Sequence, residues 1–457
     1  MKNKRVVVCL KYFKGELNPF DCAALECALE FGIKDIIVLS MAPMSALSAF
    51  QGITRLGIKG VFISDPLYAG SDTQATSFIL AEAIKRLQPD VIFCGRQSVD
   101  GDTAQVPPMI AQRLGFKIKT RAMQFDGERV TLRNGEQFTL QEKTLVTFEK
   151  IRTLRFPSLF SKMAEVEIWD NQRLGLPKEK CGLSGSPTRV IKSYESNIGR
   201  RVCTFVGLEK LSGLIKEGLE KQRIEQTQKT QEKLDEVYFV GKVKTIAESI
   251  AKRAIELKTE GKTVEEIACE LSNKKAKAVL WEDSETLKIL ASQVAVLTGA
   301  GICADCISFC VESGNLVMTR PAQGGNITAD IVCTSDMAFA TVRTVKNDEA
   351  DIIFSVGKGA IDQMEKIKSL AEKCGAEICC SRIVADSGKM PYTAQVGLTG
   401  RTVCPKVYVA FGVSGAVQHT CAISGVGTVI AVNVDKNARM FDYADYGIIA
   451  EVKNVEL

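Results

Sequence analysis

Short runs of β-branched residues alternate with amphipathic segments along most of this chain. The first 95 residues contain the runs VVVCL, DIIVLS, VFIS and DVIFCG, and between them lie stretches such as DCAALECALEFG and DTQATSFILAEAIKRL. Strands that alternate with helices form βαβ units, because the helix returns the chain to the start of the next parallel strand. The sequence therefore predicts an α/β protein with mostly parallel sheets.

One pattern of strand, loop, helix and hairpin occurs twice. The segment from Gly115 to Arg133 matches the segment from Gly301 to Arg320 with one inserted residue, and each follows a strand and a helix. An internal repeat of this kind predicts two related βαβ domains. We expect them to face each other across a pseudo-twofold axis.

A third unit begins near residue 344 and contains strand-like runs that are followed directly by glycines, as in DIIFSVGKGA and VYVAFGVSGA. This pattern predicts a doubly wound parallel sheet whose ligand edge lies at the carboxyl ends of its strands. Residues 221–236 contain almost no large apolar residue, which is typical of a linker. We therefore expect domains over 1–205, 237–343 and 344–457, with a helical and polar linker over 206–236.

Charge and hydropathy exclude several classes of protein. The 59 basic and 54 acidic residues are interspersed, and no basic tract with interleaved aromatic residues suggests a nucleic-acid partner. No apolar run approaches the roughly 18 residues of a membrane span. The apolar run Val6–Leu10 is too short for a signal peptide, so we expect a first strand there. Sixteen cysteines without such a signal indicate a reducing, cytoplasmic location.

Three glycine-rich loops in the third unit favour a bound anion. SVGKGA, GVSGAVQH and QVGLTGR each place backbone N–H groups near a strand end, and Lys358 and Arg382 add positive charge. None of these loops fits G-x-x-x-x-G-K-[ST] or G-x-G-x-x-G. The sequence predicts a cofactor that carries phosphate groups.

The chain has a single histidine, His419, which follows the turn at Gly415. An imidazole beside a cofactor ring can stabilise negative charge that develops on reduction. The alternative is a half-buried histidine whose ring nitrogens are satisfied by the protein. Both interpretations stay open at this stage.

Cysteine clusters do not indicate a metal site. Cys303, Cys306 and Cys310 lack a fourth clustered ligand, and they occur where a strand enters a hairpin. Cys379 and Cys380 lie in a strand-like run, where cysteine acts as a small apolar residue. We expect no metal ion at either cluster.

The first domain carries a second candidate site in CGRQSVDGDTAQVPP. A glycine, two acidic residues, a threonine and an amide follow a strand there, and they suit the ribose and phosphates of a nucleotide. The alternative is a capped loop in which Asp102 or Thr103 caps the next helix.

These motifs carry a family resemblance. PKVYVAFGVSGAVQHTCAISGVGTVIAVNVDKNARMFDYADYGIIAEV closely resembles the FAD domain of the electron transfer flavoprotein (ETF) α subunit, and SRIVADSGKMPYTAQVGLTGR resembles the flavin loops of that domain. RPAQGGNITADI and MAFATVR resemble the end of the α subunit's first domain. NPFDCAALECALEFG, CGRQSVDGDTAQVPPMIAQRLG and GLSGSPTRV are similar to the β subunit. The resemblance implies a fused β–α chain with two adenine-nucleotide-binding-like domains and an FAD domain.

The resemblance also implies which residues hold FAD. His419 matches the residue at the pyrimidine edge of the flavin, where it favours the anionic reduced forms; Thr399 matches the residue near flavin N5, and Arg382 the arginine over the ring. Lys358 stands where the family usually has arginine, Leu398 replaces a polar residue and Glu451 replaces an aspartate. The remaining matched positions are Gly359, Ser381, Gln395, Val396, Gly397, Ser414, Gly415, Ala416, Val417, Gln418 and Asn433.

In the β-like half, the resemblance implies a second nucleotide site that holds AMP in ordinary members and a second FAD in electron-bifurcating members. The matching residues are Cys9, Asn18, Met41, Val99, Asp100, Gly101, Asp102, Thr103, Ala104, Gln105 and Val106. The hairpin before GELNPFD is shorter than in the β subunit. The first α-like domain is expected to keep only its later half. The partner-recognition loop around Leu159 is also shortened.

The resemblance implies an electron carrier rather than a substrate-converting enzyme. FAD would accept electrons from a flavin-dependent dehydrogenase, such as an acyl-CoA dehydrogenase, and pass them to a downstream acceptor. One alternative is a bifurcating NADH oxidoreductase with a second FAD. Another is a flavin- or nucleotide-binding regulatory module without electron transfer. Whether two chains associate as a homodimer stays open.

Overall fold

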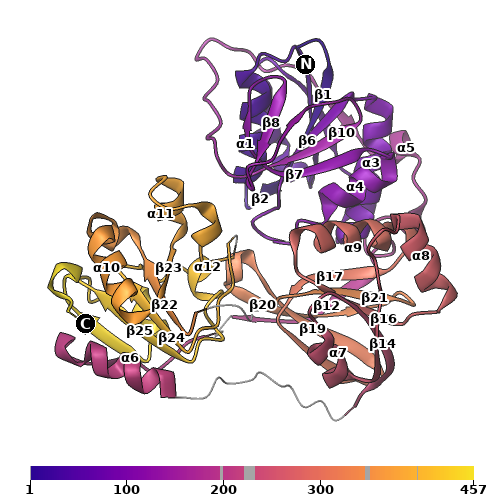
Figure 1. The fold of residues 1–457 in the computed structure, drawn as a ribbon. Helices are drawn as coiled ribbons and strands as arrows, with labels where there is room; N and C mark the ends of the chain where they lie inside the picture. The colour runs from indigo at the N-terminus through magenta and orange to yellow at the C-terminus, as the bar shows by residue number, and fades with distance from the viewer. Residues whose placement is uncertain (1, 196–198, 221–231, 345–349, 399, 457) are drawn as a thin grey trace. The chain divides into compact units, whose positions relative to one another are not determined.

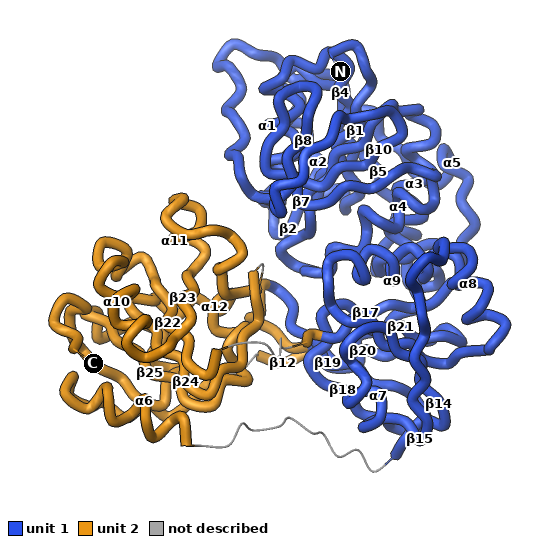
Figure 2. The backbone as a smooth tube through the Cα atoms, viewed as in Figure 1, with its two compact units in different colours: residues 1–192, 230–323, 329–342 blue, residues 193–229, 324–328, 343–457 orange. Residues whose placement is uncertain are grey.

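The computed structural model describes residues 2–195, 199–220, 232–344, 350–398 and 400–456. The chain forms two compact units, which Figure 2 colours separately. Unit 1 comprises residues 1–192, 230–323 and 329–342, and unit 2 comprises residues 193–229, 324–328 and 343–457. Thr399 and residues 221–231 of the expected linker lie outside the described residues.

A nine-stranded sheet forms the first half of unit 1. In sheet order its strands are β11 (Val166–Trp169), β5 (Lys59–Ile63), β4 (Asp35–Met41), β1 (Arg5–Leu10), β6 (Val91–Gly95), β10 (Thr144–Phe148), β7 (Lys117–Phe125), β8 (Arg129–Leu132) and β9 (Gln137–Thr139). The strands from β11 to β7 are parallel, and β8 and β9 are antiparallel additions. A short hairpin of β2 (Tyr12–Phe13) and β3 (Glu16–Leu17) follows β1.

Helices cover both faces of this sheet, so its central strands are continuously apolar. Val6 and Val8 of β1 face the core that contains α1 (Pro19–Glu30), whereas Val7 faces the core that contains α3 (Thr73–Leu87). The other helices of this half are α2 (Leu47–Thr54), α4 (Val106–Leu114) and α5 (Asn171–Leu174). The expected first strand and the expected α/β class are both confirmed (Figure 1).

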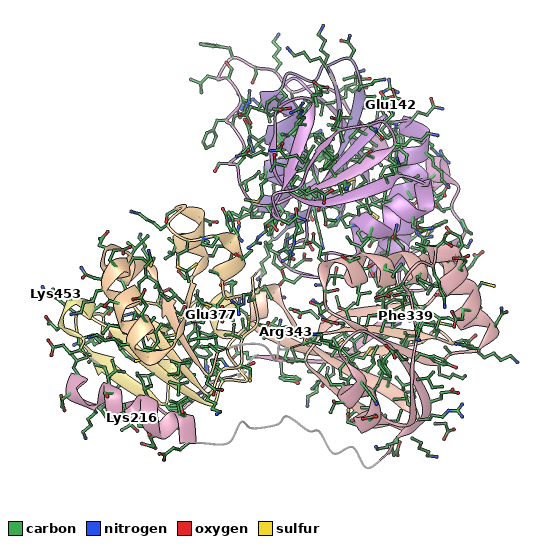
Figure 3. The ribbon with its side chains drawn as sticks, viewed as in Figure 1. Glu142, Lys216, Phe339, Arg343, Glu377 and Lys453 are labelled. Carbon is green, nitrogen blue, oxygen red and sulfur yellow. The ribbon has the colours of Figure 1, made fainter. Side chains whose placement is uncertain are left out.

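A five-stranded parallel sheet forms the second half of unit 1. In sheet order its strands are β15 (Ala251–Glu256), β14 (Leu234–Val240), β16 (Ala278–Glu282), β21 (Ala338–Val342) and β17 (Gly301–Cys306), and its helices are α7 (Lys244–Ile250), α8 (Val264–Asn273) and α9 (Glu285–Thr298). Trp281 and Phe339 pack in its core with 5.5 Å between their ring centroids, and Figure 3 labels Phe339. Because β14 and β15 precede the repeated segment, the expectation that only the later half of this domain remains is wrong.

The two sheets share one strand order. The order β15-β14-β16-β21-β17 repeats the order β4-β1-β6-β10-β7 of the first sheet. Helices α4 and α9 end at Gly115 and Gly299, with φ of 67° and 70°, so the helix-ending glycine of the repeat is Gly299 rather than Gly301. These equivalent helices pack against each other, as a pseudo-twofold arrangement requires. The prediction of two related domains is confirmed. The alignment of the two repeated segments is corrected by two residues, because Gly115 corresponds to Gly299.

A four-stranded sheet contains the hairpin after β17. Its order is β12 (Thr188–Glu195), β20 (Ile327–Cys333), β19 (Asn315–Ala322) and β18 (Ser308–Glu312). Cys303 and Cys306 lie on β17 and Cys310 lies on β18, where the sequence placed them. Within the residues that the structure describes, no three His, Cys, Asp or Glu side chains gather as metal ligands.

Unit 2 contains a six-stranded parallel sheet. In sheet order its strands are β13 (Thr204–Phe205), β26 (Tyr446–Ile449), β25 (Thr428–Asn433), β24 (Val407–Phe411), β22 (Ile352–Val356) and β23 (Glu377–Cys380), and its helices are α6 (Leu211–Glu220), α10 (Met364–Cys374), α11 (Arg382–Asp386) and α12 (Val417–Thr420). From β23 to β26 the order is that of a flavodoxin-like doubly wound sheet, with its switch point between β22 and β24. This confirms the expected fold of the third unit.

The boundaries of the compact units differ from those expected at residues 205 and 236. Leu211, Leu214 and Ile215 of α6 lie in the same core as Phe354 and Val407, so this segment belongs with the C-terminal sheet. At its other end, the expected linker overlaps the start of β14 at Leu234. The helix expected in this linker is present as α6, but the polar composition of 206–236 concealed the apolar face that packs on the C-terminal sheet and the start of β14.

None of the helices in the described ranges is long and apolar enough to cross a membrane.

Candidate functional site

The switch point of the unit 2 sheet is built from two glycine loops that touch. Gly357 follows β22 and Gly412 follows β24, and a Cβ at Gly357 would overlap the carbonyl of Gly412 and lie 2.5 Å from Val413 Cα. Gly412 has a φ of +61°, and a Cβ there would lie 2.5 Å from the backbone nitrogen of Ala360. Glycine allows both the close approach and the left-handed backbone. The carboxyl ends of β22 and β24 therefore present backbone rather than side chains.

A cavity of about 290 Å³ opens over these strand ends. Asn433 lies in its wall, where its Nδ2 donates to the carbonyl of Val413 at 3.0 Å and its Oδ1 accepts from the backbone N–H of Asp435 at 3.1 Å. Asn433 therefore joins the ends of β25 and β24 beside the cavity. The lining residues are Gly359, Gln363, Gly412, Val432, Asn433, Val434, Ala450, Glu451, Val452 and Lys453.

The loop after α11 packs against α12. Leu398 N–H donates to the carbonyl of Gln418 at 2.6 Å, and a Cβ at Gly397 would lie 2.8 Å from the same oxygen. Val396 N–H donates to the carbonyl of Cys380 at 2.9 Å. These contacts bring the expected residues of QVGLTGR next to those of GVSGAVQH. Arg382 opens α11 and pairs with Asp386 at 3.3 Å.

His419 is buried behind this loop. It is 6% exposed, and its Nε2 lies 2.8 Å from the hydroxyl of Tyr408. Its Nδ1 has no hydrogen-bond partner among the described residues. Burial lowers the pKa of His419 to about 4, and the backbone of Val396 opposes this shift only in part. A buried ring nitrogen without a protein partner fits a ligand at this edge, so the residues present suit the predicted cofactor.

The expected FAD residues in the described ranges lie along this carboxyl edge. Gln395, Val396, Gly397, Gly415, His419 and Asn433 are buried, whereas Lys358, Gly359, Ser414, Ala416, Gln418 and Glu451 are exposed. Ser381, Arg382, Leu398 and Val417 are intermediate. Thr399 lies outside the described residues. The roles of all these residues toward FAD stay predictions.

The burial of His419 predicts a pH dependence of stability. An exposed histidine has a pKa near 6.5, so the unfolded chain binds this proton between about pH 6.5 and pH 4, whereas the folded chain does not. Acidification through that range should cost up to about 3 kcal/mol of the free energy of unfolding. Urea unfolding at several pH values should show this loss in the wild type and not in His419→Gln.

The comparison with His419→Gln is needed because protonation of Asp21 changes the free energy of unfolding in the opposite direction on acidification. Burial raises the pKa of Asp21 to about 7, so the folded state gains stability as this carboxyl is protonated on acidification. Only the difference between the two pH profiles therefore reports on His419. Parallel profiles for the wild type and His419→Gln would contradict the assignment.

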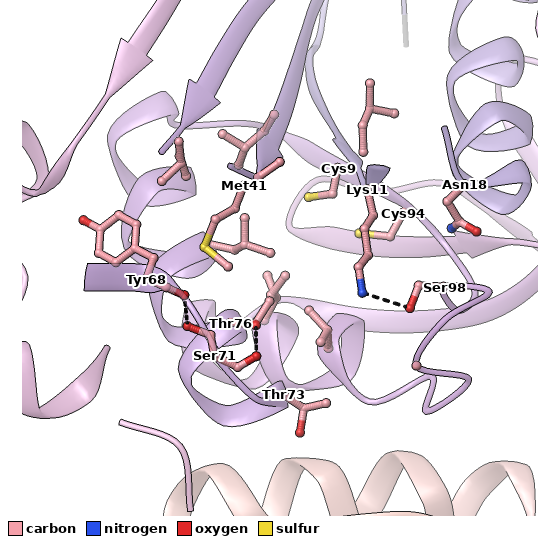
Figure 4. A pocket seen from close by; sticks show the side chains of 18 of the residues that line it. Cys9, Lys11, Asn18, Met41, Tyr68, Ser71, Thr73, Thr76, Cys94 and Ser98 are labelled. Atoms are coloured by element: carbon pink, nitrogen blue, oxygen red, sulfur yellow. Dashed lines mark hydrogen bonds between the residues drawn. The ribbon is translucent and has the colours of Figure 1, made fainter. Parts of the chain in front are cut away.

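Unit 1 contains a larger cavity, of about 850 Å³, at the switch point between β1 and β6. Figure 4 shows Cys9, Met41, Cys94 and Asn18 around it, together with Lys11 and Ser98. The expected second-nucleotide residues that line it are Cys9, Asn18, Met41, Gly101, Thr103, Ala104, Gln105 and Val106. The short hairpin of β2 and β3 therefore does not prevent a cavity from forming.

Three expected residues are not among those that line this cavity. Asp100 instead pairs with Lys11 Nζ at 2.8 Å, and Asp102 accepts a hydrogen bond from Gln97 Nε2 at 3.0 Å. The backbone of Asp102 is left-handed, with a φ of 51°. Val99 lies in the same turn. Adjacent residues of a turn point in different directions, so a continuous run of ligand residues could not all face the cavity.

Buried amides in this cavity lack protein partners. Gln105 is fully buried, and neither its Nε2 nor its Oε1 has a hydrogen-bond partner among the residues described; the same holds for Oδ1 of Asn18. Leaving such groups unpaired costs about 1–3 kcal/mol each, so their partners must come from water or a ligand in the cavity. Both residues therefore fit a polar ligand such as a nucleotide.

Sequence reasoning missed Asp21, which also lines the cavity. Its carboxylate accepts hydrogen bonds from the N–H groups of Lys11 at 2.7 Å and Gly95 at 3.0 Å, so it joins the ends of β1 and β6. Gly95 must be glycine because a Cβ there would overlap Asp21. The available signal was an acidic residue in the first turn of α1, which resembles an ordinary helix-start residue.

The fold defines an α/β protein with one cavity at the switch point of its nine-stranded sheet and another at the carboxyl edge of its six-stranded sheet. Known proteins agree with this class. The electron transfer flavoprotein domain matches residues 6–145 and 243–369, and the electron transfer flavoprotein FAD-binding domain matches residues 347–424.

Individual relatives divide between two subunits. The electron transfer flavoprotein subunit alpha of Thermoanaerobacterium thermosaccharolyticum is 33% identical over 245 residues, which cover 43% of this chain and 73% of the relative. Subunit beta of the same organism is 35% identical over 210 residues, which cover 42% of this chain and 80% of the relative. Protein FixB of Rhizobium meliloti is 32% identical over 209 residues, which cover 35% of this chain and 59% of the relative.

The chain belongs to the electron transfer flavoprotein family, and it joins regions similar to the beta and alpha subunits in one polypeptide. The match to the FAD-binding domain assigns FAD to unit 2.

Proposed function

We propose that this chain carries electrons on FAD between a flavin-dependent dehydrogenase, such as an acyl-CoA dehydrogenase, and a downstream acceptor. The observation that carries the proposal is the glycine-lined switch point between β22 and β24, with its cavity and the buried His419 beside it. Bound FAD supplies the one- and two-electron chemistry, and the protein supplies position and electrostatics.

Different residues of unit 2 would bind the phosphate groups and the flavin ring of FAD. Backbone N–H groups of the loops at Gly357 and Gly412 offer donors to phosphate oxygens, and Lys358 adds a positive charge at the exposed edge. Lysine keeps the charge of the usual arginine but loses its planar pair of donors. Arg382 and His419 would lie at the flavin ring. Because His419 is buried, it would act as a neutral hydrogen-bond donor rather than as an imidazolium.

An exposed apolar loop supports docking of a partner. Phe156, Leu159 and Phe160 are 94%, 89% and 93% exposed. Arg55 holds the base of this loop by donating to the carbonyl of Ser158 at 3.0 Å and of Ser161 at 3.2 Å. Large apolar side chains that protrude together mark interaction sites. The shortened loop therefore retains an apolar tip that could dock on a dehydrogenase.

The test is reduction of the FAD-loaded chain by a purified acyl-CoA dehydrogenase and its acyl-CoA substrate. The flavin absorbance should bleach in a dehydrogenase-dependent manner, and Leu159→Ser should slow bleaching while the bound FAD content stays the same. If FAD binds and several flavin-dependent dehydrogenases fail to reduce it, the regulatory-module alternative replaces the carrier.

We also propose that the unit 1 cavity binds an adenine nucleotide, either AMP or a second FAD. Its volume of about 850 Å³ lies near the upper end of the roughly 300–1,000 Å³ of small-molecule sites, which leaves room for more than a mononucleotide. This volume favours the second candidate function, a bifurcating NADH oxidoreductase. Direct bleaching of the bound flavin by NADH would support it, and an inert response would support the simple carrier.

Gln105→Leu should weaken retention of the unit 1 nucleotide about 10- to 100-fold. The substitution keeps the size of the side chain but removes both buried amide atoms, and lost pairing of this kind costs about 1.5–3 kcal/mol. The measurement is the amount of nucleotide released on denaturation. Gln112→Leu, in the helix that Gln105 precedes and outside the lining of the cavity, is the matched control. Equal release from both variants would contradict the site.

A further inference from the structure

Tyr408 and His419 form a buried polar pair in the C-terminal sheet of unit 2. Tyr408 lies on β24 and is fully buried, and its hydroxyl is 2.8 Å from Nε2 of His419 on α12. Their ring centroids are 6.2 Å apart at an interplanar angle of 54°, so the contact is made by the hydroxyl rather than by ring stacking.

We propose that Tyr408 is a positioning residue that donates its hydroxyl proton to Nε2 of His419 and thereby fixes the histidine as the Nδ1–H tautomer. The proposal rests on the proposed function, in which His419 contacts the flavin of bound FAD. It concerns how the protein prepares that histidine.

The count of donors and acceptors favours this direction of the hydrogen bond. A neutral imidazole has one N–H donor and one bare acceptor nitrogen, and a tyrosine hydroxyl has one proton to donate. If Nε2 carried the proton, the Tyr408 proton would lose its acceptor on the imidazole, and Nδ1 would be a buried acceptor without a partner in the described ranges. If Tyr408 donates, its proton is paired on Nε2, its oxygen can accept from the Ser355 hydroxyl, and the Nδ1–H is the form that the Val396 backbone favours. The second arrangement leaves fewer buried polar groups unpaired.

The surroundings of the pair favour neutral forms of both groups. Burial raises the pKa of Tyr408 well above its usual value and lowers the pKa of His419. The groups that bear on the pair are the Ser355 hydroxyl on β22 and the thiols of Cys379 and Cys380 on β23, which act on Tyr408, and the backbone of Val396, which acts on His419. A neutral imidazole of fixed tautomer can then offer one N–H in one direction.

As a consequence, the one N–H donor of the neutral His419 imidazole lies at Nδ1. Nδ1 makes no geometric hydrogen bond within the described residues, and the backbone of Val396, one of the expected FAD residues, favours a proton on this ring, so we expect the Nδ1–H to lie on the side of the cofactor loop. A hydrogen bond from a buried donor stabilises added negative charge on the acceptor, because no water competes for it. Tyr408 would thus influence the flavin through His419 without touching it.

The single histidine makes the tautomer directly measurable. In a chain labelled with ¹⁵N-histidine, every histidine ring signal comes from His419. We expect one protonated nitrogen at Nδ1 and one bare nitrogen at Nε2, in both the FAD-free and FAD-loaded chain at neutral pH. A wild-type spectrum with the proton on Nε2 would overturn the proposal without the need for any variant.

Tyr408→Phe removes only the hydroxyl, so His419 should no longer be held in a single tautomer. We expect the ring signals to shift to a mixture of tautomers or to Nε2–H, whereas Tyr443→Phe, at another buried tyrosine of unit 2, should leave them unchanged. Wild-type tautomer signals in Tyr408→Phe would overturn the positioning role.

A second readout separates this proposal from the proposed function. Tyr408→Phe and His419→Ala should each lower the affinity of the chain for reduced FAD, relative to oxidised FAD, by about tenfold, the size of one hydrogen bond to a developing charge. If His419→Ala leaves this ratio unchanged, the flavin role of His419 fails, while a tautomer change in Tyr408→Phe still supports the positioning of His419 by Tyr408.

Discussion

Gly412→Val should yield a chain that no longer retains FAD through purification. Gly412 has a φ of +61°, and its Cβ would lie 2.5 Å from the backbone nitrogen of Ala360 and 2.6 Å from the carbonyl carbon of Gly359. Valine is strained in the left-handed region, and the neighbouring backbone cannot yield as a flexible side chain could. The two loops of the switch point must then separate. We expect FAD affinity to fall by at least about 100-fold and the free energy of unfolding by about 3 kcal/mol.

The matched control for Gly412→Val is Gly375→Val. Gly375 ends α10 with a φ of +64°, so it shares the left-handed backbone, but no atom lies within 4 Å of a Cβ built there. Its variant should lose stability by about 1–2 kcal/mol from backbone strain alone and should keep FAD. Visible absorbance after purification reports the flavin, and urea unfolding reports the stability. Full FAD content in Gly412→Val would contradict the assignment of this crevice.

Glu149→Gln should strongly destabilise unit 1. Glu149 is buried, and its Oε1 lies 3.1 Å from Nε of Arg96, 3.5 Å from Nη1 of Arg133 and 3.8 Å from Nε of Arg121. The amide keeps the shape of the side chain but removes the negative charge, which leaves three guanidinium groups without their shared carboxylate. Breaking a buried ion pair in this way typically costs about 3–5 kcal/mol. We expect a loss of that size in the unfolding of unit 1.

The control for Glu149→Gln is Glu136→Gln, which breaks an exposed pair. Glu136 lies 2.7 Å from Nζ of Lys119, and the Lys119 and Glu136 side chains are 37% and 48% exposed. Exposed pairs contribute about 0–1 kcal/mol, so this variant should unfold almost as the wild type does. Comparable urea midpoints for Glu149→Gln and Glu136→Gln would contradict the structural role of the arginine cluster.

Local patterns predicted most of the fold. Alternation of β-branched runs with amphipathic helices identified the strands β1, β4, β5 and β6 and the strands from β22 to β25, because parallel strands covered on both faces are continuously apolar. The segment at α6 was predicted less well. Its polar exposed face resembles a linker, and only packing of Leu211, Leu214 and Ile215 against a distant sheet distinguishes the two. The sequence alone could not show that distant contact.

The candidate site was predicted in its outline and not in its internal contacts. Glycines after strands pointed to both switch points, since the carboxyl ends of parallel strands share one edge of the sheet. The contact of His419 with Tyr408 and the clamp made by Asp21 were not predicted. Both involve ordinary residue types that act only through tertiary neighbours. The arginines around Glu149 come from three separate segments, so no local pattern marks them.

The most direct test of the central claim is a count of the nucleotides that the purified chain releases on denaturation, with FAD and AMP measured separately per chain. We predict one FAD from unit 2, lost in Gly412→Val and kept in Gly375→Val. If an additional AMP or a second FAD is released, it identifies the ligand of the unit 1 cavity. Its retention should then be weaker in Gln105→Leu. A wild-type chain that binds no FAD, even after reconstitution with excess FAD, would contradict the account.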